Sequence, residues 1–506
     1  MERVAPRQVN YDNILPLAIE SRSNRREFLP VNGQSFSNAN GATIIRIDVN
    51  ADSMLDATHS YLECDITNDN ATSDNRLALN GFGPGWIQRL RIESGGVVIE
   101  DINEYSRLYS MLSLNQCPQH FVQNNFANMG MYDVPHTGGL LTTAASALET
   151  VGAPASGFVA GVGAVATETE LHYNMSAQCQ VAGVSSTTAT SATADAAGNR
   201  PTDGGLVTHN KYRILSGAKR KMCIPLVSGF LNMDKYIPLI MMNAGFTIEL
   251  HICDANRIGI TQVEAADTIQ GAFVASKWTL SNVKYVAHLI DLDRSFYDRL
   301  RAVMESSAGV LQLAGQTYRH YVGSLPVGQG PHTITIPARV KSVKSIFGTF
   351  IASDQVGQTN CFDTPVFQTS AISKFRFEIG SVRYPQTDVS ADTEENFVEL
   401  EKAFGKLGDY QHQQAYGPKH TLSKQAVRDG TTNHNSLLSA FTIGYDFEAF
   451  QRVALEAGIN TADRSLPINF ICEKNATTDQ ATRADFYVLT DAIYYINLDG
   501  TVSVSV

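Results

Sequence analysis

A segment in which the hydrophobic period changes from two residues to about four constrains the fold of this 506-residue chain more than any other feature. Residues 87–93 alternate between apolar and charged side chains, which is the pattern of a strand with one buried face. Gly95-Gly96 then permits a tight turn into a second extended run. Beyond Asp101, apolar residues recur about once per helical turn. Residues 84–114 are therefore predicted to form a strand, a turn, a second extended segment and a helix.

A related unit follows 285 residues later (376 minus 91). Residues 376–380, RFEIG, align with residues 91–95, RIESG, and a helical stripe of Phe397, Leu400 and Phe404 comes next. A chain of this length is too long for one hydrophobic core, so two or three domains are expected. The repeated unit suggests two similarly built halves, although a five-residue match can also arise by chance.

The composition favours β structure. Tyr (19), Phe (23) and Gly (38) are frequent, Thr and Val are abundant, and long helical patterns are rare. Each half contains about eight strand-like segments joined by loops of uneven length, which predicts a mainly β chain of two antiparallel sandwiches or jelly rolls. The strands predicted in the second half are 333–336, 340–351, 374–379, 438–447, 466–472 and 486–506, with a hairpin turn at 497–500.

The predicted domains follow from these patterns. Residues 1–38 form an extended arm interrupted by three prolines, either a solvated tail or an arm that reaches a neighbouring subunit. The first domain covers 39–290 and the second 291–506. Residues 138–208 are rich in Ala, Thr, Ser and Gly and contain one basic residue, so we interpret them as one long surface insertion, with an interdomain linker as the alternative.

The net charge and the cysteine pattern limit the classes of function that are expected. A formal net charge of −11 disfavours coating of nucleic acid by charge neutralisation. The N-terminus does not resemble a signal peptide, and no apolar run reaches the roughly 18 residues that span a bilayer. A soluble protein made in the cytosol is expected. The seven cysteines form no C-x-x-C pair and are expected to be free thiols: Cys64, Cys117, Cys179, Cys223, Cys253, Cys361 and Cys472.

The common catalytic motifs are missing from the sequence. There is no phosphate-binding loop and no nucleophile elbow, and Gly405-Lys406 lacks the upstream glycine. Cys117 and His120 have the spacing of half a zinc site, but no second pair of that kind accompanies them. His251 and His288 lie in predicted strands and are interpreted as structural. No catalytic, cofactor or metal site is therefore predicted, and no cofactor.

Three charged clusters have both a functional and a structural interpretation. Asp291-Leu292-Asp293 could bind a divalent metal but precedes a predicted helix, where carboxylates cap exposed N–H groups. We favour capping. The acidic group of Glu394, Glu395, Glu399 and Glu401 is interpreted as a solvated face. The basic group of Lys211, Arg213, Lys219, Arg220 and Lys221 could contact phosphate, but we favour a solvated or subunit-contacting edge.

Several segments together resemble a known family. They are WIQRLRIESGGVVIEDINEYSRLYSML, SGFLNMDKYIPL followed by FTIEL, YVAHLIDLD, and GINTADRSLPINF with the C-terminal FYVLTDAIYYINLDGTVSVSV. In this order they resemble the double jelly-roll major capsid proteins of Polinton-like viruses and virophages, which are related to those of nucleocytoplasmic large DNA viruses. The resemblance covers residues 41–506 except the insertion.

This resemblance implies two eight-stranded antiparallel jelly rolls side by side, with short helices and the insertion as an outward loop. It implies a pseudo-hexameric homotrimer that tiles the icosahedral shell of a double-stranded DNA virus, with penton and minor capsid proteins as further partners. The protein would be found in the virion after assembly in the host cytoplasm or nucleus. It implies no enzymatic activity, and an internal membrane is left open.

Two other classes remain as alternatives. A β-sandwich adhesin or fibre protein that binds glycans would use similar strands, but a secretion signal or paired cysteines would be expected. A two-domain β hydrolase would need paired carboxylates in one cleft, which distant strands could supply. The missing arginine-rich arm disfavours a shell that condenses around single-stranded RNA and suits one whose genome enters separately.

Overall fold

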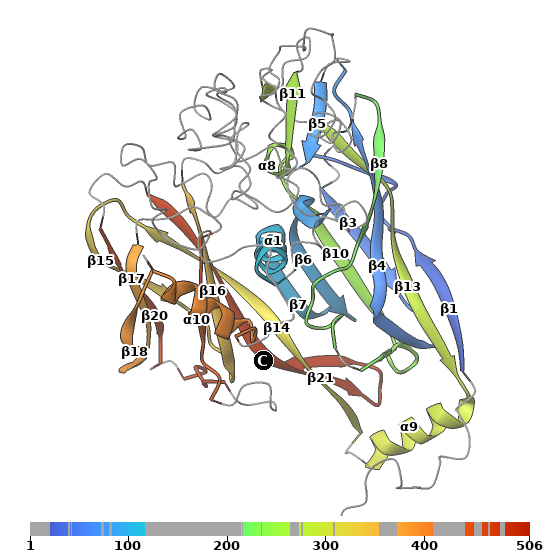
Figure 1. Ribbon diagram of the computed structural model, residues 1–506. Coiled ribbons are helices and arrows are strands. Elements are labelled where there is room, and N and C mark those ends of the chain that lie inside the picture. The colour runs from blue at the N-terminus through green and yellow to red at the C-terminus, as the bar shows by residue number, and fades with distance from the viewer. Residues whose placement is uncertain are drawn as a thin grey trace, which may run out of the picture.

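A computed structural model describes the chain, apart from short gaps, over 21–116, 214–263, 273–353, 372–407 and 441–506. The predicted insertion at 138–208 lies outside the described residues. The described strands form antiparallel sheets in two groups, and Figure 1 shows these groups side by side. The strands up to Leu292 make the first group, here called the first jelly roll, and those from Val310 onward make the second jelly roll.

The first jelly roll has two main layers. One has the order β1 (Ser21–Phe28), β13 (Trp278–Leu292), β4 (Met54–Asn68) and β8 (Lys219–Ile224). The other has the order β3 (Ile44–Val49), β10 (Phe246–Ile252), β6 (Ile87–Ser94) and β7 (Val97–Asn103). Short additions are β2 (Ser35–Phe36), β9 (Ile237–Pro238) and a small sheet of β5 (Asn75–Leu79), β11 (Gly259–Val263) and β12 (Phe273–Val274).

The second jelly roll repeats this plan. Its first layer has the order β14 (Val310–Leu325), β21 (Thr482–Asn497), β16 (Val343–Ala352) and β19 (Thr442–Asp446), with β22 (Val502–Ser505) paired to β21. Its other layer has the order β15 (Gly330–Ile336), β20 (Ile468–Lys474), β17 (Ile372–Ile379) and β18 (Val382–Ser390). The predicted mainly β double jelly roll is confirmed.

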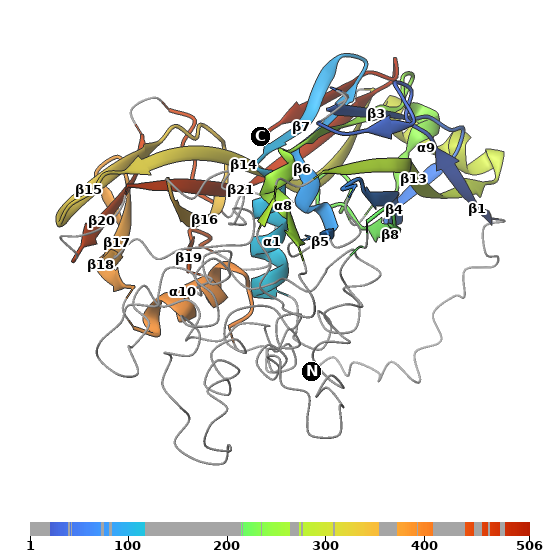
Figure 2. The ribbon, with the colours of Figure 1, turned by 90° about the horizontal axis from the view of Figure 1, so that it is seen from above.

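The helices are short and lie between or beyond the strands. They are η2 (Gly83–Trp86), α1 (Tyr105–Gln116), η3 (Leu239–Met241), α8 (Ala255–Ile258), α9 (Arg294–Ser306) and α10 (Glu395–Ala403). Seen from above in Figure 2, α1 lies between the two jelly rolls. It belongs to the first jelly roll and faces the second.

Alternation in the sequence accounts for the layers. In β3, Ile45, Ile47 and Val49 are fully buried while the residues between them are exposed, and β10 pairs with this strand in register. Burial of each such side chain contributes about 1.5–3 kcal/mol. A shift of one residue would turn the whole apolar face to solvent, so the alternation also fixes the register.

The repeated strand unit occupies equivalent places in the two jelly rolls. β6 and β17 are each third in their layer and each turns into an edge strand that leads to a helix, α1 or α10. Arg91 lies 3.4 Å from Glu93 in β6, and Arg376 lies 2.9 Å from Glu378 in β17. Gly380, in the second turn, has a φ of 61°. The aligned residues therefore have the same structural role twice.

Several strands were not predicted, among them β1, β14 and β18. Residues 21–28, assigned to the arm, instead form β1, which pairs with β13 from Ser21↔Leu292 to Phe28↔Tyr285; residues 1–20 are outside the described part. β18 was also missed. β14 was missed because Gly315 and Gly323 interrupt its pattern, but a Cβ at Gly315 would lie 2.9 Å from Tyr494 and one at Gly323 would lie 2.5 Å from Ile334. Close packing requires both glycines.

The C-terminal hairpin is as predicted. β21 and β22 pair antiparallel, and the Asn497 carbonyl accepts a hydrogen bond from the N–H of Gly500 at 2.9 Å. Gly500 has a φ of 78°, the left-handed conformation that glycine adopts without strain. Its carbonyl in turn accepts from the N–H of Asn243 in the first jelly roll at 3.1 Å. The final hairpin therefore also joins the two halves.

A loop of the first jelly roll lies directly on β14. An ideal Cβ at Gly229 would be 1.5 Å from the carbonyl oxygen of Gln316. This distance is too short for any side chain to fit. The backbones of the two jelly rolls touch at this point. Only glycine permits this approach.

Replacing Gly229 with alanine should lower the free energy of unfolding by about 3 kcal/mol, because backbone on one side must move. Urea denaturation followed by circular dichroism measures the change. Gly33→Ala is the matched control, since its Cβ would meet only the Phe36 ring at 3.3 Å, and its cost should stay below about 1 kcal/mol. Equal stability of the two variants would contradict the close backbone contact.

Candidate functional site

The cysteines and histidines that the structure describes do not converge on one site. Cys117 and His120 lie outside the described residues, whereas Cys64, Cys223, Cys253 and Cys472 are free thiols. Burial raises the pKa of Cys472 to about 12, so this thiol is unreactive at neutral pH. Over the described ranges, no group of three His, Cys, Asp or Glu side chains is placed to hold a metal ion.

The two singled-out histidines lie in different sheets. His251 is in β10, 4.0 Å from Glu249, and burial lowers its pKa. His288 is in β13, with its ring centroid 6.1 Å from that of His59. These contacts fit the structural interpretation of both residues.

The D-x-D motif is divided between two tasks. The carboxylate of Asp293 accepts a hydrogen bond from the Ser295 hydroxyl and another, at 3.3 Å, from the Ser295 N–H at the start of α9, and these two bonds lower the pKa of Asp293. Asp291 instead accepts from the Asn24 side chain in β1 at 2.7 Å. Asp293 therefore caps α9, whereas Asp291 joins β13 to β1.

The acidic and basic clusters form local pairs. Glu399 lies 2.5 Å from Lys402, and Glu395 accepts from the N–H of Ser390 at 2.9 Å. The basic residues of β8 pair across the sheet with acidic residues of β4: Lys221 with Glu63 at 2.7 Å, and Lys219 with Asp65 at 3.8 Å. Lys211 and Arg213 lie outside the described residues.

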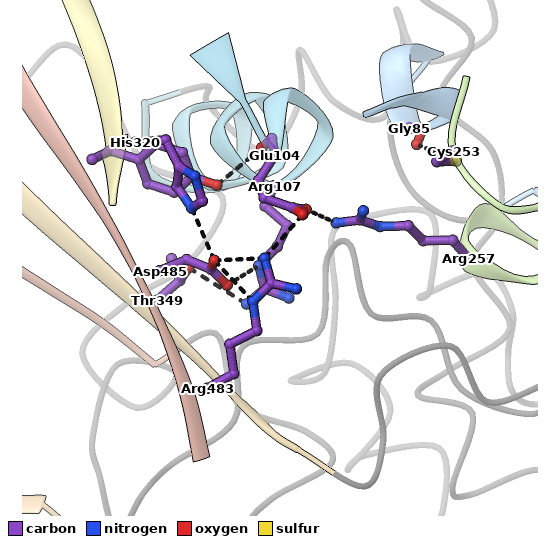
Figure 3. Close-up of polar contacts among 10 residues, drawn as sticks. Gly85, Glu104, Arg107, Cys253, Arg257, His320, Thr349, Arg483 and Asp485 are labelled. Atoms are coloured by element: carbon purple, nitrogen blue, oxygen red, sulfur yellow. Dashed lines mark hydrogen bonds and ion pairs between the residues drawn. The ribbon is translucent and has the colours of Figure 1, made fainter. Parts of the chain in front are cut away.

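The most densely bonded polar cluster of the described chain was not predicted. It lies between the jelly rolls and consists of Glu104, Arg107, Arg257, His320, Arg483 and Asp485, here called the ion network (Figure 3). The first three come from the first jelly roll, before α1, in α1 and in α8, and the last three from β14 and β21. The network therefore crosses the boundary between the halves.

Asp485 is the centre of the network. It is fully buried, and its carboxylate lies 3.2 Å from Arg107 Nε, 2.9 Å from Arg483 Nη2 and 2.9 Å from His320 Nε2. Burial alone would raise the pKa of Asp485, but the His320 hydrogen bond and the two arginines outweigh it and hold the pKa well below its usual range. The carboxylate stays ionised because groups from both jelly rolls compensate it.

Glu104 ties the network to the backbone. Its carboxylate pairs with Arg257 and, at 2.9 Å, with Arg483, and its carbonyl accepts from the Tyr487 hydroxyl at 2.9 Å. These arginines overcome the effect of burial and lower the pKa of Glu104. Its φ is 53°, a conformation that costs a non-glycine residue of order 1 kcal/mol. The contacts to the second jelly roll keep this strained turn in place.

Because side chains alternate along β21, this strand contributes both to the interface with α1 and to the core of the second jelly roll. Asp485 and Tyr487 point toward α1, while Phe486 and Val488 point into the core of the second jelly roll. α1 is correspondingly buried on all sides, including Arg107, which is 1 % exposed. β21 and α1 are covered in this way because the two jelly rolls pack against each other here.

A second carboxylate, Glu100 of β7, bridges the halves near the Gly229 loop. It accepts from the N–H of Gly229 at 2.9 Å, from the Thr317 hydroxyl of β14 at 2.6 Å and from the Ser228 hydroxyl. Burial raises its pKa and outweighs these donors. The bridge holds β7 next to β14 by hydrogen bonds rather than by ion pairs.

Apolar packing completes the interface. The ring of Phe230 packs edge-on against Tyr494 of β21, with centroids 5.3 Å apart. The core of the first jelly roll continues through this contact into residues of the second, including Leu313, Phe347 and Ile496. The first hydrophobic cluster therefore extends across the boundary, while the second jelly roll also has a separate core of its own.

The chemistry of the ion network suits a fixed structural role. A buried Asp–His pair is also found in hydrolases, but here two arginines hold the carboxylate, and His320 is 4 % exposed at its side chain. Such a carboxylate is a poor proton carrier at neutral pH. The network positions the jelly rolls.

Comparison with known proteins adds the following. No family model and no curated protein matches the sequence. The VP54 protein of PBCV-1, in a crystal structure fitted into a reconstruction of the virophage Sputnik, superposes with a TM-score of 0.54 over 98 % of this chain and 99 % of that chain, at 8 % identity. The Faustovirus major capsid protein gives 0.52 over 95 % and 92 %, and the cryo-EM structure of the Sputnik virophage 0.52 over 100 % and 93 %, both at 10 % identity.

These similarities extend over nearly the full length of each chain. They show that the protein shares its fold with these structures. In the part that the structure describes, no helix is long and apolar enough to cross a membrane.

Asp485→Ala should destabilise the protein by about 3–5 kcal/mol, because Arg107 would lose its buried partner. Chemical denaturation measures this loss. Glu305→Ala is the control: it breaks the exposed Arg301–Glu305 pair, at 3.8 Å, and should cost less than about 0.5 kcal/mol. Arg107→Met should cost less in the Asp485→Ala background than in the wild type, and strict additivity would argue against the pairing.

The stability difference between wild type and Asp485→Asn should depend on pH. Because the pKa of Asp485 is lower in the folded than in the unfolded state, its ionisation stabilises the fold above about pH 5, and this contribution is lost as the pH falls toward the folded pKa. Urea titrations at pH 7, 5, 4 and 3 should show the difference shrinking with acidification. A difference that stays constant would show that the charge of Asp485 does not matter.

Proposed function

We propose that this chain is a major capsid protein that self-assembles as pseudo-hexameric homotrimers into the icosahedral shell of a double-stranded DNA virus. The observation that carries the proposal is that two equivalent jelly rolls are joined through a buried interface. Such a unit presents the same architecture twice, which suits a building block with quasi-sixfold contacts. The fold shared with the Faustovirus major capsid protein and the Sputnik virion structure supports the proposal.

The interface inside the chain suggests how copies associate. Within the chain, β7 and α1 of the first jelly roll pack against β14 and β21 of the second. The shared strand order makes β18 and α10 the counterparts of β7 and α1, and β1 and β13 the counterparts of β14 and β21. The two counterpart surfaces lie on different jelly rolls of one chain and do not face each other.

These counterpart surfaces are open in the single chain. Most residues of β1 and β18 are exposed, whereas β7 and β14 are more covered. We propose that β18 of one copy packs against β1 and β13 of the next, repeating the internal contact. A head-to-tail contact of this kind closes into a ring if its rotation permits, and three copies with two jelly rolls each give a six-part ring.

The remaining parts of the proposal concern partners and location. A shell protein needs packing surfaces rather than a reaction centre, so we propose that the protein has no enzymatic activity. Neighbouring capsomers, penton proteins and minor capsid proteins are the proposed partners, without sequence-specific nucleic-acid binding. The proposed location is the virion, after assembly in the host cytoplasm or nucleus.

Purified protein should be a trimer of about 165 kDa, three times the 55.1 kDa chain. Size-exclusion chromatography with light scattering measures this mass, and negative-stain microscopy should show hexagon-like particles. Closing the ring buries surface at each contact between copies, and we expect well over ~2,000 Å² of buried surface per interface. A stable monomer at micromolar concentration, especially one that binds a glycan on an array, would instead favour an adhesin.

A matched pair of variants locates the contact. Thr387 is exposed on β18, so Thr387→Arg should place a bulky charge in the proposed interface and shift the population from trimer to monomer at least about tenfold. Thr333→Arg is the control, because Thr333 is exposed on β15, at the opposite edge of the same layer. Circular dichroism verifies that both fold. Trimers that tolerate Thr387→Arg as well as Thr333→Arg would refute this interface.

A further inference from the structure

Helix α9 projects at one end of the molecule, beside the end of β13 (Figure 1). Two of its side chains hold it to the body: the Tyr297 hydroxyl accepts from the N–H of Leu292 at 3.2 Å, and Met304 is buried. The carbonyl of Met304 also accepts from the N–H of Gly309 at 2.8 Å. These contacts fix one side of the helix.

Next to the side of α9 that contacts the body runs an apolar stripe that the rest of the described chain covers only in part. Phe296, Leu300 and Val303 have the i, i+4, i+7 spacing of one helix face, and Val303 is 53 % exposed. Leu498 is 47 % exposed, and its N–H donates to the Gly309 carbonyl at 2.8 Å, near the end of the helix. Apolar side chains therefore gather at this end of the molecule with no cover over part of their surface.

The chain itself supplies an apolar segment at this place. β1 begins at Ser21, which pairs with Leu292, two residues before α9. Residues 14–19 read ILPLAI, six consecutive residues without a charge, flanked by Asp12 and Glu20. The residues that precede β1 therefore join the described structure directly beside the apolar stripe.

Length and charge also match. Residues 14–20 in extended form span about 23 Å, and a 13-residue helix such as α9 is about 20 Å long. Arg299 and Arg301 are exposed on α9 and can meet the flanking carboxylates. Each Å² of apolar surface that is removed from water contributes about 25 cal/mol of favourable free energy. Docking of the six apolar residues on the adjacent apolar stripe is therefore favourable.

We infer that residues 14–19 dock along the Phe296–Leu300–Val303 stripe of α9 in the same chain. The same-chain arrangement is favoured because the segment is tethered next to the helix, which gives it a high effective concentration there. The contact ties β1 and the connection between the jelly rolls into one unit at this end. It is independent of the proposed function, since it concerns the isolated chain.

Hydrogen–deuterium exchange of the full-length protein tests the inference. Leu15→Ser/Leu17→Ser should raise the exchange rate of the α9 amides about tenfold or more by uncovering the helix, and leave α10 unchanged. Val4→Ser/Val9→Ser is the matched control outside the apolar run and should leave α9 at the wild-type rate. Unchanged α9 exchange in the first variant would overturn the inference.

Cross-linking identifies which chain provides the segment. In a Leu17→Cys/Val303→Cys variant, oxidation should give a disulfide within one chain, so the denatured, non-reduced protein should migrate as a single chain. The two single-cysteine variants control for the native thiols. A covalent dimer specific to the double variant would overturn the same-chain arrangement and assign the segment to a neighbouring copy.

Discussion

The charge of Asp485 can be buried only where the two jelly rolls meet. Arg483 lies in the same strand as Asp485. Arg107 lies in α1 of the other jelly roll, and its Nε is 3.2 Å from the Asp485 carboxylate. Separating the halves would leave Asp485 and Arg107 without each other, at a cost of several kcal/mol. Hydrophobic contact alone would hold the halves together, whereas the ion network also fixes their orientation. The proposed assembly depends on the relative orientation of the halves that this pairing helps to set.

The interface also explains why equivalent strands have different surroundings. β14 is largely covered by the first jelly roll, whereas β1, which occupies the same place in its own layer, is mostly exposed. In the layer of the first jelly roll that contains β1 and β13, paired charges such as Lys221–Glu63 join neighbouring strands. Polar cross-strand pairs keep such a face soluble in the monomer and still permit a specific contact between copies.

Much of the fold was predictable because it follows from short-range patterns. The alternation in 87–93, the Gly95-Gly96 turn and the helix after Asp101 each depend on neighbouring residues, and the structure contains all of them. β14 was missed because its glycines serve contacts with distant side chains and interrupt the alternation. The interface was missed as well, since Arg107 in a predicted apolar stripe was its only local sign.

The sequence by itself determined the strand periods, the repeated strand–turn–helix unit and the absence of a familiar catalytic motif, because these are properties of adjacent residues. Only the tertiary structure decided which polar and charged groups meet. The Tyr487 hydroxyl donates to the carbonyl of Glu104, 383 positions away, and Asp485 pairs with Arg107 across the same boundary. No local pattern encodes such pairs, because each charge becomes tolerable in the interior only when the chain has folded and brought its partner within hydrogen-bond distance.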